Sequence, residues 1–235
     1  MKQKLFLLSA CMIFLMTGCF GTKNEKKEVK KASDVTVKVN KTEGMDLKTY
    51  FTENNEIIFD VTNTGSDIID YLNIDVAFFD KDGNLMKTDK QYLKNITSKK
   101  QDFVKLSLAQ YDEKGTITLP TRIEISLNKT IYSTKFETVY NDKVTGEVAK
   151  TDTDSQLSLN LSNNSGETLD DVTAAVVFYK DSKPVDVQVS SFQSVGTSAS
   201  QTIYVPTISS DNGVKQLDYD ETKVIINNAS KYVTQ

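Results

Sequence analysis

The run Asp80-Lys81-Asp82-Gly83-Asn84 places oxygen-bearing side chains at alternate positions, which is similar to the start of a calcium-binding loop. In such a loop the alternate oxygens reach one ion, and a bidentate Glu follows at the twelfth position. The twelfth position here is Gln91. The run also fits the turn of a β-hairpin between two apolar stretches. We favour the hairpin turn and expect no metal site, and the calcium alternative would use Asp80, Asp82 and Asn84 as ligands.

Residue types that carry much of enzyme chemistry are missing from this sequence. There is no histidine, which excludes histidine acid–base catalysis, serine–histidine nucleophiles and histidine-ligated zinc. The two cysteines are Cys11 and Cys19, and no phosphate-binding loop, dinucleotide fingerprint or nucleophile-elbow motif occurs. Aspartates and glutamates are scattered, and no pair of them stands out. We therefore expect no enzymatic activity, no catalytic residue and no cofactor.

The first residues have the pattern of a bacterial export signal. Two lysines precede an apolar stretch from Leu5 to Met16, which is shorter than the about 20 residues of a membrane-spanning helix. The run Met16-Thr17-Gly18-Cys19 resembles a lipobox, at which the signal peptide is cleaved before the cysteine and diacylglycerol is attached to its sulfur. The pattern predicts a lipoprotein signal peptide over residues 1–18 and a lipid anchor on Cys19.

Two alternatives to this anchor follow from the same residues. Leu8-Ser9-Ala10-Cys11 matches the lipobox letters better, but its apolar stretch would be shorter than the about 7–15 residues of an export signal. An ordinary secreted protein, cleaved at another site, would carry no lipid. Lipidation at Cys19 also leaves no free thiol in the mature chain. We therefore expect a protein that is lipid-anchored to the cell membrane on its extracellular face.

Charge divides the mature chain into a basic tail and an acidic remainder. The whole chain has 28 lysines and arginines against 32 aspartates and glutamates, and loss of the two signal-peptide lysines changes the net charge from −4 to −6 (26 − 32). Residues 19–33 are lysine-rich without apolar periodicity, so we expect a lipidated, disordered tether. Its lysines are either solvated or in contact with anionic lipids. An acidic chain with a single arginine, Arg122, is not expected to bind nucleic acid.

An internal repeat organises the rest of the chain. Residues 57–85 and 157–185 align without a gap at an offset of 100 residues, so that Asn63 falls on Asn163. In each copy two stretches alternate apolar and polar side chains with the period of a β-strand, and turn residues separate them. We expect the two stretches of each copy to pair with one another as a hairpin.

The second strand of the second copy is apolar on both of its faces. Ala175, Val177 and Tyr179 lie between the inward-facing positions of this strand. A strand with two apolar faces is typical of a central strand that is covered on both sides.

The repeat resembles the FxLYD-type repeat of Gram-positive lipoproteins. The matching positions are Val61, Asn63, Gly65, Phe78, Phe79 and Asp80 in the first copy, and Leu161, Asn163, Gly166, Phe178 and Tyr179 in the second. Lys180 and Pro184 depart from the pattern, so the second copy is the more diverged. The resemblance covers the two repeated segments and implies an immunoglobulin-like β-sandwich without catalytic residues.

Alternating strands at this spacing predict an all-β chain with two tandem immunoglobulin-like β-sandwich domains, at residues 34–128 and 129–235. Only Asn128 to Thr130 separate the expected strands of the two domains, so we expect their relative movement to be limited.

Two classes of function remain. The first is a pair of non-catalytic binding modules that docks an unidentified protein or cell-envelope component. The second is a structural accessory or spacer subunit of a membrane-associated complex. The expected loops over residues 40–55 and 140–155 are the longest and differ between the copies, so we expect recognition to lie there.

Overall fold

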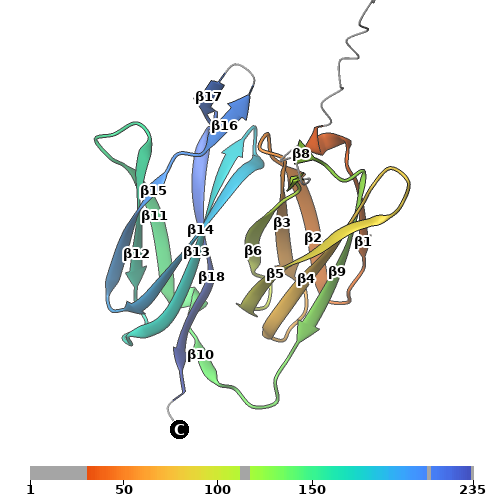
Figure 1. Cartoon of the computed structure of the whole chain (residues 1–235). Helices are drawn as coiled ribbons and strands as arrows, with labels where there is room; N and C mark the ends of the chain where they lie inside the picture. The colour runs from red at the N-terminus through yellow and green to blue at the C-terminus, as the bar shows by residue number, and fades with distance from the viewer. Residues whose placement is uncertain (1–30, 112–116, 211–212, 234–235) are drawn as a thin grey trace, which may run out of the picture.

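The computed structural model describes residues 31–111, 117–210 and 213–233. These residues form two β-sandwiches that lie side by side, and each sandwich consists of two main sheets (Figure 1). The all-β fold expected from the sequence is confirmed. The predicted signal peptide, Cys19 and most of the predicted tether lie outside the described residues. Across the described ranges, no helix has the length and apolar character needed to cross a membrane.

The first sandwich, module 1, runs from η1 (Ala32–Asp34) to β9. Its larger sheet has the order β1-β9-β4-β5, with the bounds Thr36–Asn40 (β1), Arg122–Thr130 (β9), Ile69–Phe79 (β4) and Leu85–Ile96 (β5). Its smaller sheet has the order β2-β3-β6, with the bounds Met45–Phe51 (β2), Glu56–Asn63 (β3) and Gln101–Ser107 (β6). A short ladder joins β7 (Gln110–Tyr111) to β8 (Ile117–Thr118).

The second sandwich, module 2, repeats this order of elements. Its larger sheet is β10-β18-β13-β14, with the bounds Glu137–Val139 (β10), Glu221–Tyr232 (β18), Leu169–Lys180 (β13) and Lys183–Val195 (β14). Its smaller sheet is β11-β12-β15, with the bounds Val144–Lys150 (β11), Gln156–Asn163 (β12) and Ser198–Tyr204 (β15). A ladder of β16 (Thr207–Ser210) and β17 (Gly213–Gln216) and the turn η2 (Asn141–Lys143) complete it. The repeat therefore extends well beyond the two aligned segments.

The first strand of each module is the point at which the two copies differ. β1 lies parallel to β9, with Thr36 opposite Arg122. β10 instead pairs antiparallel with the end of β18, with Glu137 opposite Tyr232. Relative to the last strand of its own module, the first strand of module 2 therefore runs in the opposite direction from the first strand of module 1.

Alternating apolar side chains form the two cores, as the sequence predicts. In module 1 the inward side chains of β3 and β4 are at most 1% exposed, and they are Ile57, Phe59, Val61, Leu72, Ile74, Val76 and Phe78. The equivalent side chains of β12 and β13 form the core of module 2. Burial of one face of each sheet against the other is the main source of stability in such a sandwich.

The expected hairpin between the two stretches of each repeat is wrong. β3 pairs with β2 and β6, while β4 pairs with β5 and β9, so the two strands belong to opposite sheets. The physical reason is that their apolar faces are buried against each other across the core, which requires a face-to-face arrangement and not an edge-to-edge one. The hairpin that does form joins β4 to β5, and its turn is the run Asp80–Asn84.

Three further boundaries differ from those expected. The stretches 40–55 and 140–155, expected as recognition loops, each contain a seven-residue edge strand, β2 and β11. β9 continues to Thr130, so the chain leaves the strand two residues after the expected domain boundary. Ala32 is buried in the core of module 1, so the expected tether ends before residue 33.

Candidate functional site

The two modules meet through an apolar contact that the repeat does not reveal. Five fully buried side chains form it, and they are Ile58 and Phe103 of module 1 with Ala175, Val177 and Val187 of module 2. The contact packs the smaller sheet of module 1 onto the outer face of β13 and its neighbours. The prediction that β13 is covered on both sides is therefore confirmed, and its second cover is module 1.

Side-chain amides of β18 surround this apolar contact. The Nδ2 atom of Asn227 donates to the main-chain oxygen of Phe103 at 2.7 Å, and its Oδ1 atom accepts from the Phe103 N–H at 3.3 Å. Asn228 accepts from the Nδ2 atom of Asn95 at 2.8 Å. The Asn227 amide donates to and accepts from one backbone residue, as a neighbouring strand would, and both bonds depend on distance and angle. These bonds therefore fix how the two modules are oriented.

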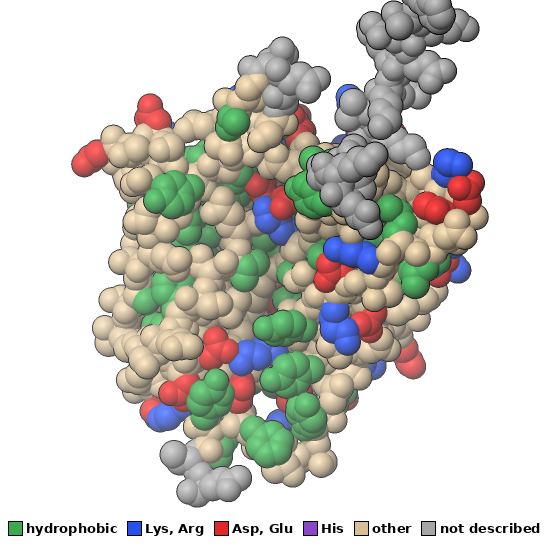
Figure 2. Space-filling model, viewed as in Figure 1, with side chains coloured by type: hydrophobic (Ala, Val, Ile, Leu, Met, Phe, Trp, Pro, Cys, Tyr) green, Lys and Arg blue, Asp and Glu red, His purple; other side chains and the backbone are tan. Residues whose placement is uncertain are grey.

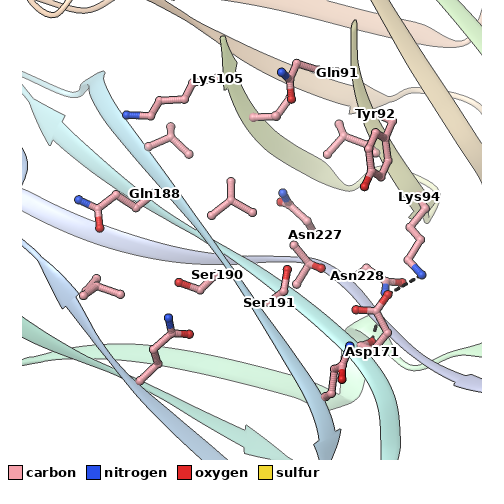
Figure 3. Close-up of a pocket in the computed structure, with 18 of the residues that line it drawn as sticks. Gln91, Tyr92, Lys94, Lys105, Asp171, Gln188, Ser190, Ser191, Asn227 and Asn228 are labelled. Carbon is pink, nitrogen blue, oxygen red and sulfur yellow. Dashed lines mark hydrogen bonds and ion pairs between the residues drawn. The ribbon is translucent and has the colours of Figure 1, made fainter. Parts of the chain in front are cut away.

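A groove with a volume of about 1000 Å³ opens beside this contact, between the two modules. Four strands at the edges of their sheets contribute to its walls: β5 and β6 from module 1, and β14 and β15 from module 2 (Figure 3). The groove lies between the apolar contact and the polar contacts that Lys94 and Asn95 of β5 make with module 2.

The two lysines that line the groove are both held in ion pairs. Lys94 Nζ lies 2.5 Å from an oxygen of Asp171 and 3.4 Å from one of Glu137. Burial lowers the pKa of the Lys94 ammonium, but the two carboxylates outweigh burial and raise the pKa above its ordinary value. Lys105 likewise bridges Asp186 at 2.7 Å to Glu56 at 2.9 Å. Each of the two lysines is thus held between two carboxylates, and Asp170 also lines the groove without an ion pair to any described residue.

Uncharged polar side chains make up much of the remaining lining. Several of them make no side-chain hydrogen bond to any described residue, and they are Gln91, Ser190, Ser191, Gln193, Gln201 and Thr202. Gln188 is different, because its Nε2 atom donates to the main-chain oxygen of Tyr204. The groove thus offers both donors and acceptors to a ligand that carries no charge.

Aromatic side chains gather where the groove meets the connection between the modules. Tyr71 lies edge-on to Tyr132, and Tyr132 lies edge-on to Phe136, with ring centroids 6.0 Å apart in both pairs. These three rings are 38%, 41% and 58% exposed, and they line a second hollow of about 250 Å³ that shares Tyr71 and Lys94 with the groove. Figure 2 shows hydrophobic side chains gathered at this lower end of the junction. The rings therefore extend the groove with an exposed apolar surface.

The metal ligands considered from the sequence lie far from the groove in the fold, on the turn between β4 and β5. The Oδ1 atom of Asp80 accepts from the N–H groups of Asp82 and Asn84 at 2.9 and 2.8 Å, and its Oδ2 atom accepts from Asn84 Nδ2 at 3.0 Å. These bonds lower the pKa of the Asp80 carboxyl. Asp82 pairs with Lys81 at 3.0 Å. The described residues contain no group of three or more acidic, cysteine or histidine side chains suited to a metal.

Asp102 is a buried carboxylate close to the junction. Its side chain is fully buried, and neither oxygen has a hydrogen-bond partner among the described residues. Lys100 Nζ lies 3.5 Å from Oδ1, and this ammonium also donates across the junction to the main-chain oxygen of Ile226. Burial raises the pKa of the Asp102 carboxyl to about 7.

Reasoning from the sequence missed the groove. Its lining comes from strands that are distant in the chain, and the polar residues that form it are ordinary strand-surface residues in isolation. One local signal was present, because Val187–Val195 is a run of nine residues with neither a charged residue nor a proline. The tyrosines Tyr71, Tyr92 and Tyr204 carry no such signal, since tyrosine is common on strand surfaces.

Comparisons with known proteins leave the family of this chain open. No model of a known protein family matches it, and no curated protein matches it. Among solved structures, the crystal structure of red sea bream transglutaminase is similar at 12% identity, over 70% of this chain and 27% of that chain, with a TM-score of 0.21. The match spans about a quarter of the transglutaminase chain, and a similarity of this size supports no argument about function.

Proposed function

We propose that this protein is a non-catalytic binding protein whose ligand lies in the groove between the modules. The observation that supports this most is the combination of a groove of about 1000 Å³ with uncharged polar side chains that have no side-chain partner among the described residues and with lysines that are already held in ion pairs. This volume is at the upper end of the about 300–1,000 Å³ usual for ligand sites. An uncharged polar ligand is the chemistry that such a lining complements.

The contact between the modules supports a groove that is formed before the ligand arrives. Val177 and Phe103 are buried at that contact, and the Asn227 amide bonds to the Phe103 backbone beside them. Separating the modules would expose these side chains and break these bonds. A preformed site binds without the free-energy cost of ordering its own parts.

The place of action in this proposal follows from the lipobox. With a lipid on Cys19, the protein is held at the extracellular face of the cell membrane. Its ligand is then a protein or a component of the cell envelope. Stable anchoring requires two acyl chains, because a single chain binds membranes only marginally.

The test is a binding measurement with two probes on the mature chain carrying Cys19→Ser. The probes are a displayed library of random twelve-residue peptides and purified peptidoglycan sacculi. Ser191→Trp fills the groove from β14, and the control Thr145→Trp adds the same bulk to the exposed edge strand β11. We expect at least one probe to bind the control and the unsubstituted chain, and to lose binding with Ser191→Trp. If all three proteins bind the probes equally, or if none of them binds either probe, the groove is not a ligand site and the spacer function is favoured.

A further inference from the structure

β14 begins with Lys183, Pro184 and a register shift, but from Val187 onward its edge lacks the features that usually protect a strand edge. Exposed edges are commonly guarded by lysine, proline or bulges, because their open N–H and C=O groups pair readily with another strand. β5, the equivalent strand of module 1, carries Lys87, Lys90 and Lys94. In β14 the nine residues Val187–Val195 contain neither charge nor proline. The two copies of the repeat therefore differ at the edge that borders the groove.

Hydrogen bonds indicate which groups of β14 point to its open side. The N–H of Val187 donates to the carboxylate of Asp186 at 2.6 Å, which places it away from β13. The N–H and C=O of one residue point to the same side of a strand, and the side alternates along the chain. Val189, Ser191 and Gln193 therefore present their backbone groups to the open side. Within the described residues, these three form no backbone hydrogen bond outside their own sheet.

The groove has room for one more strand beside this edge. Consecutive residues of β14 line the groove, although their side chains alternate between the two faces of the sheet. The strand therefore borders the groove with its edge as well as with one face (Figure 3). β5 of module 1 and β15 of module 2 stand on either side. Tyr92 of β5 and Tyr204 of β15 are 67% and 60% exposed there. Walls on both sides admit a single extended chain more readily than the surface of a folded domain.

We infer that the ligand is an uncharged, extended polypeptide segment of a partner protein, which adds to the larger sheet of module 2 as a strand beside β14. This inference rests on the proposed function and names its ligand class. Main-chain hydrogen bonds to Val189, Ser191 and Gln193 supply affinity, and the polar side chains of the groove select the sequence.

The experiment measures amide hydrogen exchange on the mature Cys19→Ser chain, with and without a peptide enriched from the twelve-residue library. Strand addition slows exchange at Val189, Ser191 and Gln193, by about tenfold when the peptide is present at about ten times its Kd. The amides of Gln188, Ser190 and Phe192 change little, because they already bond to β13. Slower exchange at every second amide distinguishes strand addition from recognition through side chains, which does not protect alternate amides. Protection without alternation would overturn the inference.

Two substitutions at one residue separate backbone from side-chain recognition. Ser191→Pro removes the outward N–H at an edge position, where proline is tolerated, and we expect peptide affinity to fall at least about fivefold. Ser191→Ala keeps the N–H and removes the hydroxyl, and we expect affinity within about twofold of the unsubstituted chain. A larger loss with Ser191→Ala than with Ser191→Pro would contradict strand addition.

The remaining outcomes distinguish this inference from the proposed function. If Ser191→Trp abolishes binding of sacculi but no peptide is bound, the groove binds a glycan, so the proposed function stands and the inference fails. If the chain dimerises in sedimentation experiments and Ser191→Pro abolishes the dimer, the occupant of the edge is a second copy and the inference also fails. If neither probe depends on the groove, both proposals fail.

Discussion

The side chain of Asn63 ties β3 to the end of β5 by donating from Nδ2 to the main-chain oxygen of Ile96 at 3.0 Å. The same Nδ2 atom donates to the main-chain oxygen of Asp67 at 2.7 Å, and Oδ1 accepts from the N–H of Gly65 at 3.0 Å. Asn163 makes the equivalent bonds in module 2, including one to Val195 at 3.2 Å. This asparagine therefore supplies the buried bonds where the chain crosses from one sheet to the other.

Replacing Asn163 with Ala leaves these buried backbone groups without their partner. We expect Asn163→Ala to lower the free energy of unfolding by about 1–3 kcal/mol, because an unsatisfied buried polar group loses its solvation without compensation. The matched control is Asn164→Ala, since the neighbouring Asn164 is exposed. Urea denaturation followed by circular dichroism measures both. Equal midpoints for the two variants would contradict this role.

A charge at the junction is expected to separate the modules without unfolding them. Val177→Asp places a carboxylate against Phe103 and Ile58, where no partner for it lies in the apolar contact. Val177 points away from the core of module 2, so the sandwich itself keeps its packing. We expect small-angle scattering to show a larger radius of gyration than for the control Thr145→Asp. An unchanged radius with Val177→Asp would show that the contact does not hold the modules together.

Stability is expected to fall as pH rises from about 4 to about 7 through the titration of Asp102. Its pKa is raised to about 7 in the folded state by burial, above the unfolded value near 3.8. Between these pH values the folded state binds more protons than the unfolded state. The contribution of Asp102 to the free energy of unfolding is therefore present at low pH and is lost as pH rises through the folded pKa. Other carboxylates contribute in the opposite direction, so the comparison with a variant isolates this residue.

The variant for this test is Asp102→Asn, which keeps the shape of the side chain and removes its titration. We expect it to be more stable than the unsubstituted chain at pH 8, by about 1–3 kcal/mol, and the difference to shrink towards pH 5. Urea midpoints at the two pH values give both numbers. A difference that is the same at pH 5 and pH 8 would exclude Asp102 as the titrating group.

Lipid anchoring is tested by Cys19→Ala in the full-length chain. We expect the substituted protein to leave the membrane fraction, because a stable anchor requires the acyl chains that the cysteine carries. Cys11→Ala is the matched control and is expected to remain with the membrane. Membrane association that survives Cys19→Ala, or that is lost with Cys11→Ala, would contradict the lipobox assignment.

The sequence by itself determined the central strands of both cores and which of their faces are buried, although it missed the edge strands β2 and β11. The two-residue alternation of Ile57, Phe59 and Val61 is a local property, and burial followed it. The offset of 100 residues showed that the chain folds as two similar units. The apolar outer face at Ala175 and Val177 also showed that β13 is covered twice, although it did not show by what.

Tertiary structure decided how the strands pair and where a ligand fits. Alternation defines an inward face but not a partner, so it could not tell a β3–β4 hairpin from two strands that face each other across a core. Likewise, no local pattern places β5 and β14 on the walls of one groove, because their relative position depends on how the modules pack at Val177 and Phe103. The groove follows from that packing, and its side chains acquire a common role only when the two modules are joined.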